Sequence, residues 1–177
     1  MTKADFQSEF TLNNLQKTLD YLLDSNTVPI LNTNDAIAYP KEKCEDSNGS
    51  AINVNDNDSL AAKLATLINS DLLLIMSDVD GVYNCPPSQS GSRLLHTFSP
   101  KHDAKMISFG EKSNVGTGGM ESKISAADFA LDKNCSVVIC NGKSNNAIMD
   151  CINGKKIGTF FTKEPTSSVE SLAMNGA

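Results

Sequence analysis

A glycine-rich segment in the second half of the chain has the composition of an anion-binding loop: Gly116-Thr117-Gly118-Gly119-Met120-Glu121-Ser122-Lys123. Glycines ahead of a helix let backbone N–H groups approach an anion closely, and the helix N-terminus adds a favourable dipole. Lys123 lies in the first turns of the expected helix, so its ammonium can reach the same anion. The segment is not a P-loop, because GxxxxGK[ST] is absent from it. Taken alone, the segment fits an ordinary glycine turn beside a solvated lysine equally well.

Short polar side chains form a second candidate group. Asn32 and Asp35 follow an apolar run at 28–31, and Asp56-Asn57-Asp58-Ser59 precedes an amphipathic stretch. Carboxylates and amides at the ends of strands and helices can hold an amino-acid ammonium and orient basic groups around a transferring phosphate. Helix capping and Asx-turns explain most clusters of this composition, and they are the favoured interpretation of this one alone.

The third candidate is Ser77-Asp78-Val79-Asp80-Gly81-Val82-Tyr83, which follows an apolar run. A calcium loop is excluded, because D-x-[DN]-x-[DN]-G needs a third oxygen-bearing residue before the glycine and a distant glutamate. A tight turn with Gly81 at positive φ is the structural interpretation. The functional interpretation places Ser77 and Asp78 at a nucleotide.

Apolar periodicity predicts the elements that position these groups. Leucines and other apolar residues at spacings of three and four predict helices over about 11–24, 57–68, 120–131 and 145–152. Continuous apolar runs predict strands over 28–31, 72–76, 136–140 and 157–161. Residues 39–53 and 84–115 are expected to be irregular, because polar, proline and glycine residues dominate them.

Helices alternate with continuously apolar strands, which is typical of a parallel sheet buried on both faces. We therefore expect an α/β fold of three layers, α/β/α, with a mostly parallel sheet. The strands at 28–31, 72–76 and 136–140 each end in a polar or glycine-bearing cluster. Ligands of open α/β sheets bind outside the carboxyl ends of the strands, so these clusters fall where a site is expected.

Composition narrows the function. The chain has 177 residues and a net charge of −6, so it lacks the basic footprint of a nucleic-acid-binding protein. The five cysteines include no CxxC pair, which favours reduced thiols in an intracellular protein, either mitochondrial or cytoplasmic. No apolar run approaches the roughly 20 residues of a membrane-spanning helix.

Taken together and in order, the candidate segments resemble the glutamate 5-kinases of the amino-acid-kinase family. The resemblance is carried by VPILNTNDA, NDNDSLAAKLA, LLLIMSDVDGVY, VGTGGMESKISAA and GKKIGTFF, and it runs from about residue 4 to residue 162. It is closest to the kinase portion of bifunctional delta-1-pyrroline-5-carboxylate synthases, because of the DNDSLAA form and the VESLAMNGA tail. The fold that this implies is the carbamate kinase-like α/β/α sandwich, incomplete at its N-terminus.

The resemblance also implies roles by position. Asn32, Asp35 and Asn57 would contact glutamate, and Asp58 would organise the lysines of the site. Ser77 and Asp78 would contact the nucleotide, whose phosphates would be wrapped by Thr117, Gly118, Gly119, Met120, Glu121, Ser122 and Lys123. Lys123 would also stabilise the transferring phosphoryl group. The implied partners are glutamate, ATP and Mg²⁺, with homo-oligomerisation of the full-length parent protein.

One departure from the family's pattern shapes the expected activity. The family's kinases begin with a strand carrying a lysine, a glycine-rich loop over the phosphates and a serine for the amino acid, and no counterpart of these occurs in this chain. We therefore expect residues 1–162 to be the nucleotide-binding part of a kinase domain, and 163–177 to be a linker towards a reductase domain. Loss of one phosphate-binding charge typically costs about 10²–10³ in rate, so the chain alone should have little activity.

Several alternatives stay open. An acetylglutamate, aspartate or uridylate kinase shares the SDVDGVY turn, although NTNDA with DNDSLAA argues against these. A non-catalytic module that binds nucleotide or partner subunits would also keep Asp58 and Lys123. A Rossmann dehydrogenase is disfavoured, because GxGxxG does not follow a first strand.

Overall fold

The computed structural model describes Met1 and residues 3–6, 8–34, 52, 54, 56–108 and 119–166. The elements in chain order are η1 (Lys3–Phe6), α1 (Glu9–Asp24), α2 (Asn57–Leu67), β1 (Leu72–Ser77), β2 (Thr97–Phe98), α3 (Pro100–Asp103), η3 (Ala104–Met106), α4 (Met120–Asp132), β3 (Ser136–Asn141), α5 (Ala147–Ile152) and β4 (Thr159–Phe161). The helices and three of the four strands predicted from periodicity are thereby confirmed, with bounds that shift by at most two residues. No described helix is long and apolar enough to cross a bilayer.

The four strands form one sheet in the order β1-β3-β4-β2. β1 pairs with β3 in parallel, with Leu72 opposite Ser136 and Ser77 opposite Asn141, and β2 pairs with β4 in parallel. The β3–β4 pairing is antiparallel. The sheet is therefore mixed and mostly parallel, which confirms the predicted fold class.

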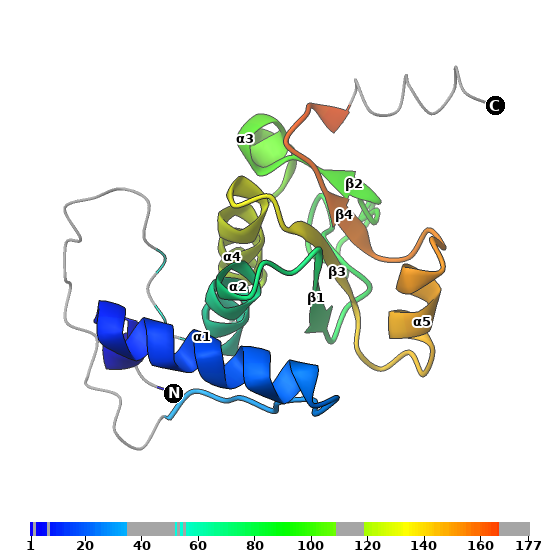
Figure 1. The fold of residues 1–177 in the computed structure, drawn as a ribbon. Helices are drawn as coiled ribbons and strands as arrows, with labels where there is room; N and C mark the ends of the chain where they lie inside the picture. Colours follow the sequence, from blue (N-terminus) through cyan, green and yellow to red (C-terminus); the bar gives the residue numbers. More distant parts are fainter. Residues whose placement is uncertain are drawn as a thin grey trace.

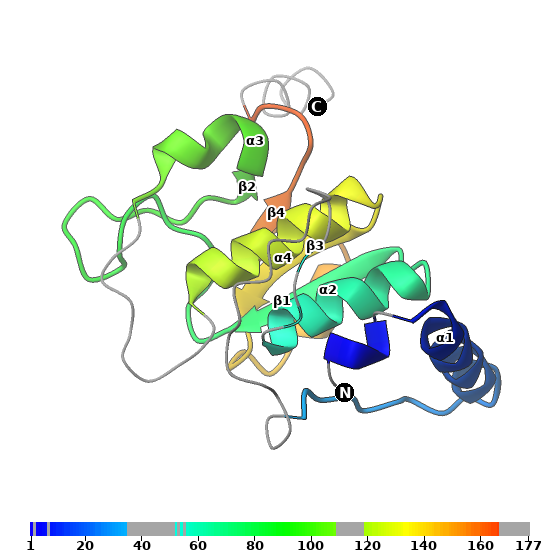
Figure 2. The same ribbon diagram turned by 90° about the vertical axis from the view of Figure 1, so that its left-hand side faces the viewer.

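Helices cover both faces of the sheet (Figure 1). α2 and α4 lie side by side on one face, over a core that includes Ile75, Phe98, Val137, Ile139 and Phe161 (Figure 2). α5 covers the other face, where Val138, Cys140 and Ala147 form a smaller cluster. The period of two along a strand explains this division, because successive side chains point to opposite faces.

The run at 28–31, predicted to be a strand, is not one: its residues lie outside any helix or strand. Val28 is 84% exposed and Ile30 is 97% exposed. A helix satisfies its own backbone groups, whereas a strand needs a neighbour to receive its N–H and C=O groups. Among the described residues no strand lies beside this run, so its apolar composition alone does not make it a strand.

The segment 84–115, predicted to be irregular, contains β2, α3 and η3 within its described part. These elements have two to four residues each. Such lengths are too short to show a period of two or 3.6, so periodicity could not reveal them.

The connections place two helix starts at one edge of the sheet. α2 ends at Leu67, just before β1 begins at Leu72, and α4 ends at Asp132, just before β3 begins at Ser136. Each helix therefore runs back along the sheet, and its N-terminus lies towards the carboxyl end of the strand that follows it. Because β1 and β3 are parallel, both N-termini reach the same edge.

Candidate functional site

An ion pair joins the first turns of α2 and α4. Lys123 Nζ lies 2.8 Å from Asp58 Oδ2 and 3.0 Å from Asp58 Oδ1, so the ammonium contacts both carboxylate oxygens. Each side chain is 16% exposed. By contrast, the ion pair between Lys101 and Asp132 has side chains that are 58% and 47% exposed. Solvent screens the Lys101 pair more strongly, so the Asp58–Lys123 pair is the stronger of the two.

Local capping explains why Asp58 is available for this contact. Asp56 is the N-cap of α2, and its Oδ1 accepts a 2.8 Å hydrogen bond from the backbone N–H of Ser59. The Ser59 hydroxyl lies 3.3 Å from the Asp56 backbone nitrogen and completes a capping box. The capping interpretation of this cluster is therefore right for Asp56. Because Asp56 serves the helix end, Asp58 is left to meet the lysine.

Asn57 ties the segment after the 28–31 run to the start of α2. Its Oδ1 accepts hydrogen bonds from the backbone N–H and from the hydroxyl of Thr33, both at 3.1 Å. The neighbouring Asn32 is exposed, and its carbonyl accepts a 2.6 Å hydrogen bond from the amino group of Met1. The structure thus brings the segment that carries Asn32 to Asn57 through Thr33. Their common role in binding a substrate stays a prediction.

Ser77 and Asp78 lie where β1 ends. Ser77 is buried, and its hydroxyl accepts a 3.5 Å hydrogen bond from the backbone N–H of Val79 and lies 3.4 Å from Asp78 Oδ1. Asp78 is exposed. A buried hydroxyl beside an exposed carboxylate, at the carboxyl edge of parallel strands, is suited to contact a polar ligand above the sheet.

The N-terminus of α4 begins without a side-chain cap. Its N-cap residue is Gly119, which makes no side-chain capping hydrogen bond. A methyl group at Gly119 would meet no atom of the described residues within 4 Å. The Ser122 hydroxyl is turned back to the Gly119 carbonyl, at 3.0 Å. A helix start without a side-chain cap leaves backbone N–H groups that can receive an anion. Binding of phosphate by this segment stays a prediction.

The remaining predicted residues divide into two groups. Met120 is half-buried and packs against the core below α2 and α4, whereas Glu121 is exposed at the first turn. Asp35, Thr117 and Gly118 lie outside the described residues.

Sequence reasoning missed a second set of polar contacts at the same edge. Asn141, at the end of β3, donates a 2.8 Å hydrogen bond from Nδ2 to Asp80 Oδ1, and the Tyr83 hydroxyl donates to Asp80 Oδ2 at 3.1 Å. Burial, followed by the hydrogen bond and the charge of Asp80, raises the pKa of Tyr83 above its ordinary value. The position of Asn141 directly after an apolar strand was the available signal, but the sequence does not identify its partner.

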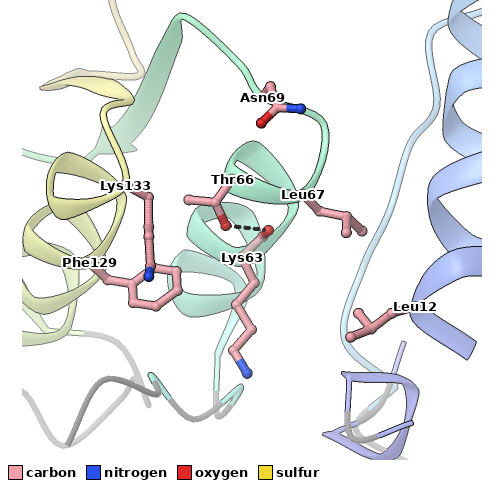
Figure 3. Close-up of a pocket in the computed structure, with 7 residues that line it drawn as sticks. All are labelled: Leu12, Lys63, Thr66, Leu67, Asn69, Phe129 and Lys133. Carbon is pink, nitrogen blue, oxygen red and sulfur yellow. Dashed lines mark hydrogen bonds between the residues drawn. The ribbon is translucent and has the colours of Figure 1, made fainter. Parts of the chain in front are cut away.

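A hollow of about 370 Å³ lies away from the ion pair, where the C-terminal halves of α2 and α4 face α1 (Figure 3). Its lining residues are Leu12, Lys63, Thr66, Leu67, Asn69, Phe129 and Lys133. Lys63 is five residues beyond Asp58 along α2, and a helix rises about 1.5 Å per residue. The hollow therefore lies at the opposite end of the helix pair from Asp58 and Lys123.

The protein is therefore an α/β domain with a mostly parallel sheet. At the carboxyl edge of that sheet, the Asp58–Lys123 ion pair lies beside a helix that begins at a glycine N-cap. Comparison with known proteins gives the family. The amino acid kinase family model matches residues 1–141, and the chain belongs to that family. The resemblance stated from the sequence motifs is thereby confirmed.

Curated relatives cover nearly all of the chain. Delta-1-pyrroline-5-carboxylate synthase 2 of Oryza sativa subsp. japonica is 43% identical over 93% of this chain and 22% of its own length. Glutamate 5-kinase of Clostridium tetani is 36% identical over 91% of this chain and 57% of its own length. The chain thus spans about a fifth of the synthase and somewhat more than half of the kinase.

Solved structures share the fold at low sequence identity. UMP kinase of Bacillus anthracis matches with a TM-score of 0.55 and 14% identity, over 85% of this chain and 52% of its own chain. N-acetylglutamate synthase of Neisseria gonorrhoeae matches with a TM-score of 0.57 and 21% identity, over 84% of this chain and 30% of its own chain. Because neither identity reaches 25%, these likenesses establish the fold alone.

Proposed function

We propose that this chain takes part in the ATP-dependent phosphorylation of the glutamate side-chain carboxylate, which gives glutamyl 5-phosphate and is the first step of proline synthesis. The observation that carries the proposal is the contact of Lys123 Nζ with both oxygens of Asp58 beside the glycine-capped start of α4. The 36% identity to a glutamate 5-kinase supports glutamate as the acceptor over the uridylate, acetylglutamate and aspartate acceptors of related kinases.

The reaction needs positioning more than proton transfer. One oxygen of the glutamate carboxylate attacks the γ-phosphorus of ATP, the bond from that phosphorus to the β–γ bridging oxygen breaks, and ADP departs. A carboxylate is already a nucleophile at neutral pH, so no general base is needed. Catalysis then depends on aligning the two substrates and on neutralising charge on the equatorial phosphate oxygens.

The residues of the site suit these tasks. Lys123 supplies a positive charge to the transferring phosphoryl group, while Asp58 holds its ammonium at the start of α4. The first-turn N–H groups from Gly119 onward, with Thr117, Gly118 and Ser122, would surround the nucleotide phosphates. Ser77 and Asp78 would contact the nucleotide, and Asn32, Asp35 and Asn57 would bind glutamate.

We expect Mg²⁺ to enter this site bound to the nucleotide. When bound to ATP, Mg²⁺ neutralises charge on the β- and γ-phosphates. Across the part of the chain that the structure describes, no group of three His, Cys, Asp or Glu side chains is arranged to hold a metal. Mg²⁺ ordinarily takes one or two carboxylates and completes its octahedron with phosphates and water, so a dedicated protein cage is not required.

We further propose that residues 1–162 are the nucleotide-binding part of a longer kinase domain, with 163–177 leading towards a reductase domain. The chain spans 57% of a single-function glutamate 5-kinase and 22% of a bifunctional synthase, which supports this division. The exposure of Val28 and Ile30 supports it too, because an extended apolar run of this kind is stabilised when a neighbouring strand pairs with it.

A second candidate function is a non-catalytic module that binds nucleotide or assembles with partner subunits. The same exposed run at 28–31 favours this candidate, since apolar side chains that meet solvent in one chain are commonly covered in an assembly. The two candidates differ in whether phosphate is transferred to glutamate.

The deciding experiment traps glutamyl phosphate with hydroxylamine in the presence of ATP, Mg²⁺ and glutamate. The chain is assayed alone and together with a polypeptide made of the residues of the Clostridium tetani kinase that lie outside the matched region. Lys123→Met removes the charge of the site, and Lys101→Met is its control, because Lys101 belongs to an exposed ion pair.

Hydroxamate that appears only with the added polypeptide, and is lost in Lys123→Met but kept in Lys101→Met, supports both proposals. If the chain alone forms as much hydroxamate as the mixture does, the proposal of a longer kinase domain is contradicted, while the proposed kinase activity is supported. If no hydroxamate forms under either condition, the proposed kinase activity is overturned. Co-elution of the two polypeptides in gel filtration would then support the non-catalytic assembly module.

A further inference from the structure

The carboxylate of Asp80 is held from two sides. Asn141 Nδ2, at the end of β3, donates to Oδ1 at 2.8 Å, and the Tyr83 hydroxyl donates to Oδ2 at 3.1 Å. Each carboxylate oxygen therefore has its own donor. Asn141 is 61 positions from Asp80, so this contact ties the turn after β1 to the neighbouring strand.

The orientation of the Asn141 amide is also set by a second contact. Its Oδ1 accepts a 2.9 Å hydrogen bond from the backbone N–H of Lys143. With Oδ1 committed to this donor, Nδ2 is the group that faces Asp80. An aspartate at position 141 would still accept from Lys143 but would present a negative charge to Asp80, so an amide is the side chain that suits both partners.

Two hydrogen bonds, one to a backbone carbonyl and one to a side-chain hydroxyl, fix the two ends of the same turn. The Gly142 N–H donates to the Ser77 carbonyl at 2.8 Å, and the Val82 N–H donates to Thr159 Oγ1 at 2.8 Å. Gly142 permits the close approach, because a Cβ there would lie 3.1 Å from Met76 Cβ. Between these ends, the Asp80–Asn141 hydrogen bond joins the middle of the turn to the end of β3.

This arrangement leaves Asp78 presented to solvent on a turn that is held at both ends and in its middle. A ligand that meets Asp78 then finds the turn already in place and loses less conformational entropy on binding. Without the middle tie, the turn would keep its ends but would sample other positions of Asp78.

We propose that Asn141 is a positioning residue for an adenine nucleotide: through Asp80 it holds the turn that carries Ser77 and Asp78 against the carboxyl end of β3. This inference rests on the proposed nucleotide binding and adds a residue to it that touches no substrate. Loss of the Asp80–Asn141 hydrogen bond should therefore weaken nucleotide binding without a comparable loss of global stability. The stability effect should be small because Asp80 is exposed and Asn141 is only half-buried.

The experiment measures the affinity of the chain for a fluorescent N-methylanthraniloyl ATP in wild type, Asn141→Ala, Asn141→Asp and the double variant Asp80→Asn/Asn141→Asp. The first two should bind about fivefold and about tenfold more weakly, because a hydrogen bond to a charged group is lost and, in the second, a like charge is added. The double variant reverses donor and acceptor, keeps the Tyr83 contact, and should bind within about twofold of wild type. The matched control is Asn145→Ala, which replaces an exposed asparagine in the connection between β3 and α5. This variant should bind like wild type.

Amide hydrogen exchange over residues 78–83 gives a readout that does not depend on nucleotide. Exchange there should quicken in Asn141→Ala and Asn141→Asp and slow again in the double variant, with the thermal midpoint nearly unchanged. Unchanged affinity and unchanged exchange in Asn141→Ala would overturn the inference, as would failure of the double variant to recover. If the wild-type chain binds no nucleotide, that result counts against the proposed function. The hydrogen-exchange comparison then still decides whether Asn141 holds the turn in position.

Discussion

Lys123 Nζ contacts both carboxylate oxygens of Asp58, at 3.0 and 2.8 Å, across 65 positions of sequence. The contact joins the starts of two helices that pack side by side over the sheet, with each side chain only 16% exposed. The pair therefore has a structural consequence as well as a chemical one. Both helix N-termini, and the positive ends of their dipoles, are held at the edge where β1 and β3 finish.

The first prediction concerns the stability supplied by this pair. Asp58→Asn should lower the free energy of unfolding by about 1–3 kcal/mol, because it leaves a mostly buried ammonium without its counter-charge. Asp132→Asn breaks the exposed pair with Lys101 and should cost less than about 1 kcal/mol. Urea unfolding followed by circular dichroism measures both, and equal losses in the two variants would contradict the prediction.

Thr159 supplies the second prediction. Its hydroxyl is buried, accepts from the Val82 N–H at 2.8 Å and donates to the Leu95 carbonyl at 2.5 Å. Thr159→Val keeps the shape but leaves both backbone groups without their partner, so it should destabilise the protein by about 2–4 kcal/mol. Thr18→Val, whose hydroxyl bonds the carbonyl of Asn14 on an exposed part of α1, is the control and should cost less than about 1 kcal/mol. A thermal midpoint that falls equally in the two variants would count against this account.

Substitutions at two glycines can distinguish the cost of a strained backbone from the cost of a steric clash. Gly154 and Gly158 both adopt positive φ, 72° and 61°. A Cβ at Gly154 would meet no atom of the described residues within 4 Å, whereas one at Gly158 would collide with the carbonyl oxygen of Ile139 and lie 2.9 Å from Cys140 Cβ.

We therefore expect Gly154→Ala to cost about 1–2 kcal/mol, the cost of left-handed backbone with a Cβ. Gly158→Ala should cost more than that and reduce the yield of folded protein, because β3 and β4 would have to separate. Urea denaturation of the two purified variants measures the difference, and a Gly158→Ala variant as stable as Gly154→Ala would refute the overlap.

The buried thiols predict how stability depends on pH. Burial raises the pKa of Cys135 and of Cys140 above the ordinary value of 9.0. On raising the pH through about 9, the unfolded chain releases these protons before the folded chain does, so the unfolded state gains relative stability. The free energy of unfolding should therefore fall between about pH 8 and about pH 10 in the presence of a reductant.

The matched variant for this pH dependence removes both thiols. Cys135→Ala/Cys140→Ala should be less stable at neutral pH, because cavities replace the sulfur atoms, yet should show a smaller fall with pH. Urea unfolding at a series of pH values measures both proteins. A fall of equal size in the double variant would assign the effect to other groups.

The exposed run at 28–31 predicts self-association. Val28→Lys/Ile30→Lys replaces two almost fully exposed apolar side chains with charges, and charges oppose edge-to-edge pairing of extended segments. The variant should sediment as a smaller species than wild type at the same concentration, with an unchanged circular dichroism spectrum. Asn13→Lys/Asn14→Lys adds the same two charges at exposed positions of α1 and is the control, which should sediment like wild type. Identical sedimentation of wild type and Val28→Lys/Ile30→Lys would contradict the prediction.

Much of the local structure could be predicted from the residues themselves. Leucine spacing predicted α1, the polar group at 56–58 predicted the start of α2, and the glycine segment predicted the start of α4. Helices are predictable in this way because their hydrogen bonds and caps involve residues only a few positions apart. The capping interpretation of the 56–58 cluster proved right for Asp56, which caps the helix, whereas Asp58 meets Lys123.

By itself the sequence determined the helices, the apolar strand candidates and the residues at their ends, because each of these depends on spacing and side-chain type within a few positions. Only the tertiary structure decided which of the candidates became strands and which polar groups met. The run at 28–31 has the composition of a strand but lacks a neighbour among the described residues, whereas β1 pairs with β3 and brings Ser77 opposite Asn141. The contacts of Asp58 with Lys123 and of Asp80 with Asn141 follow from that pairing, since a sheet brings together strand ends that lie far apart in the chain.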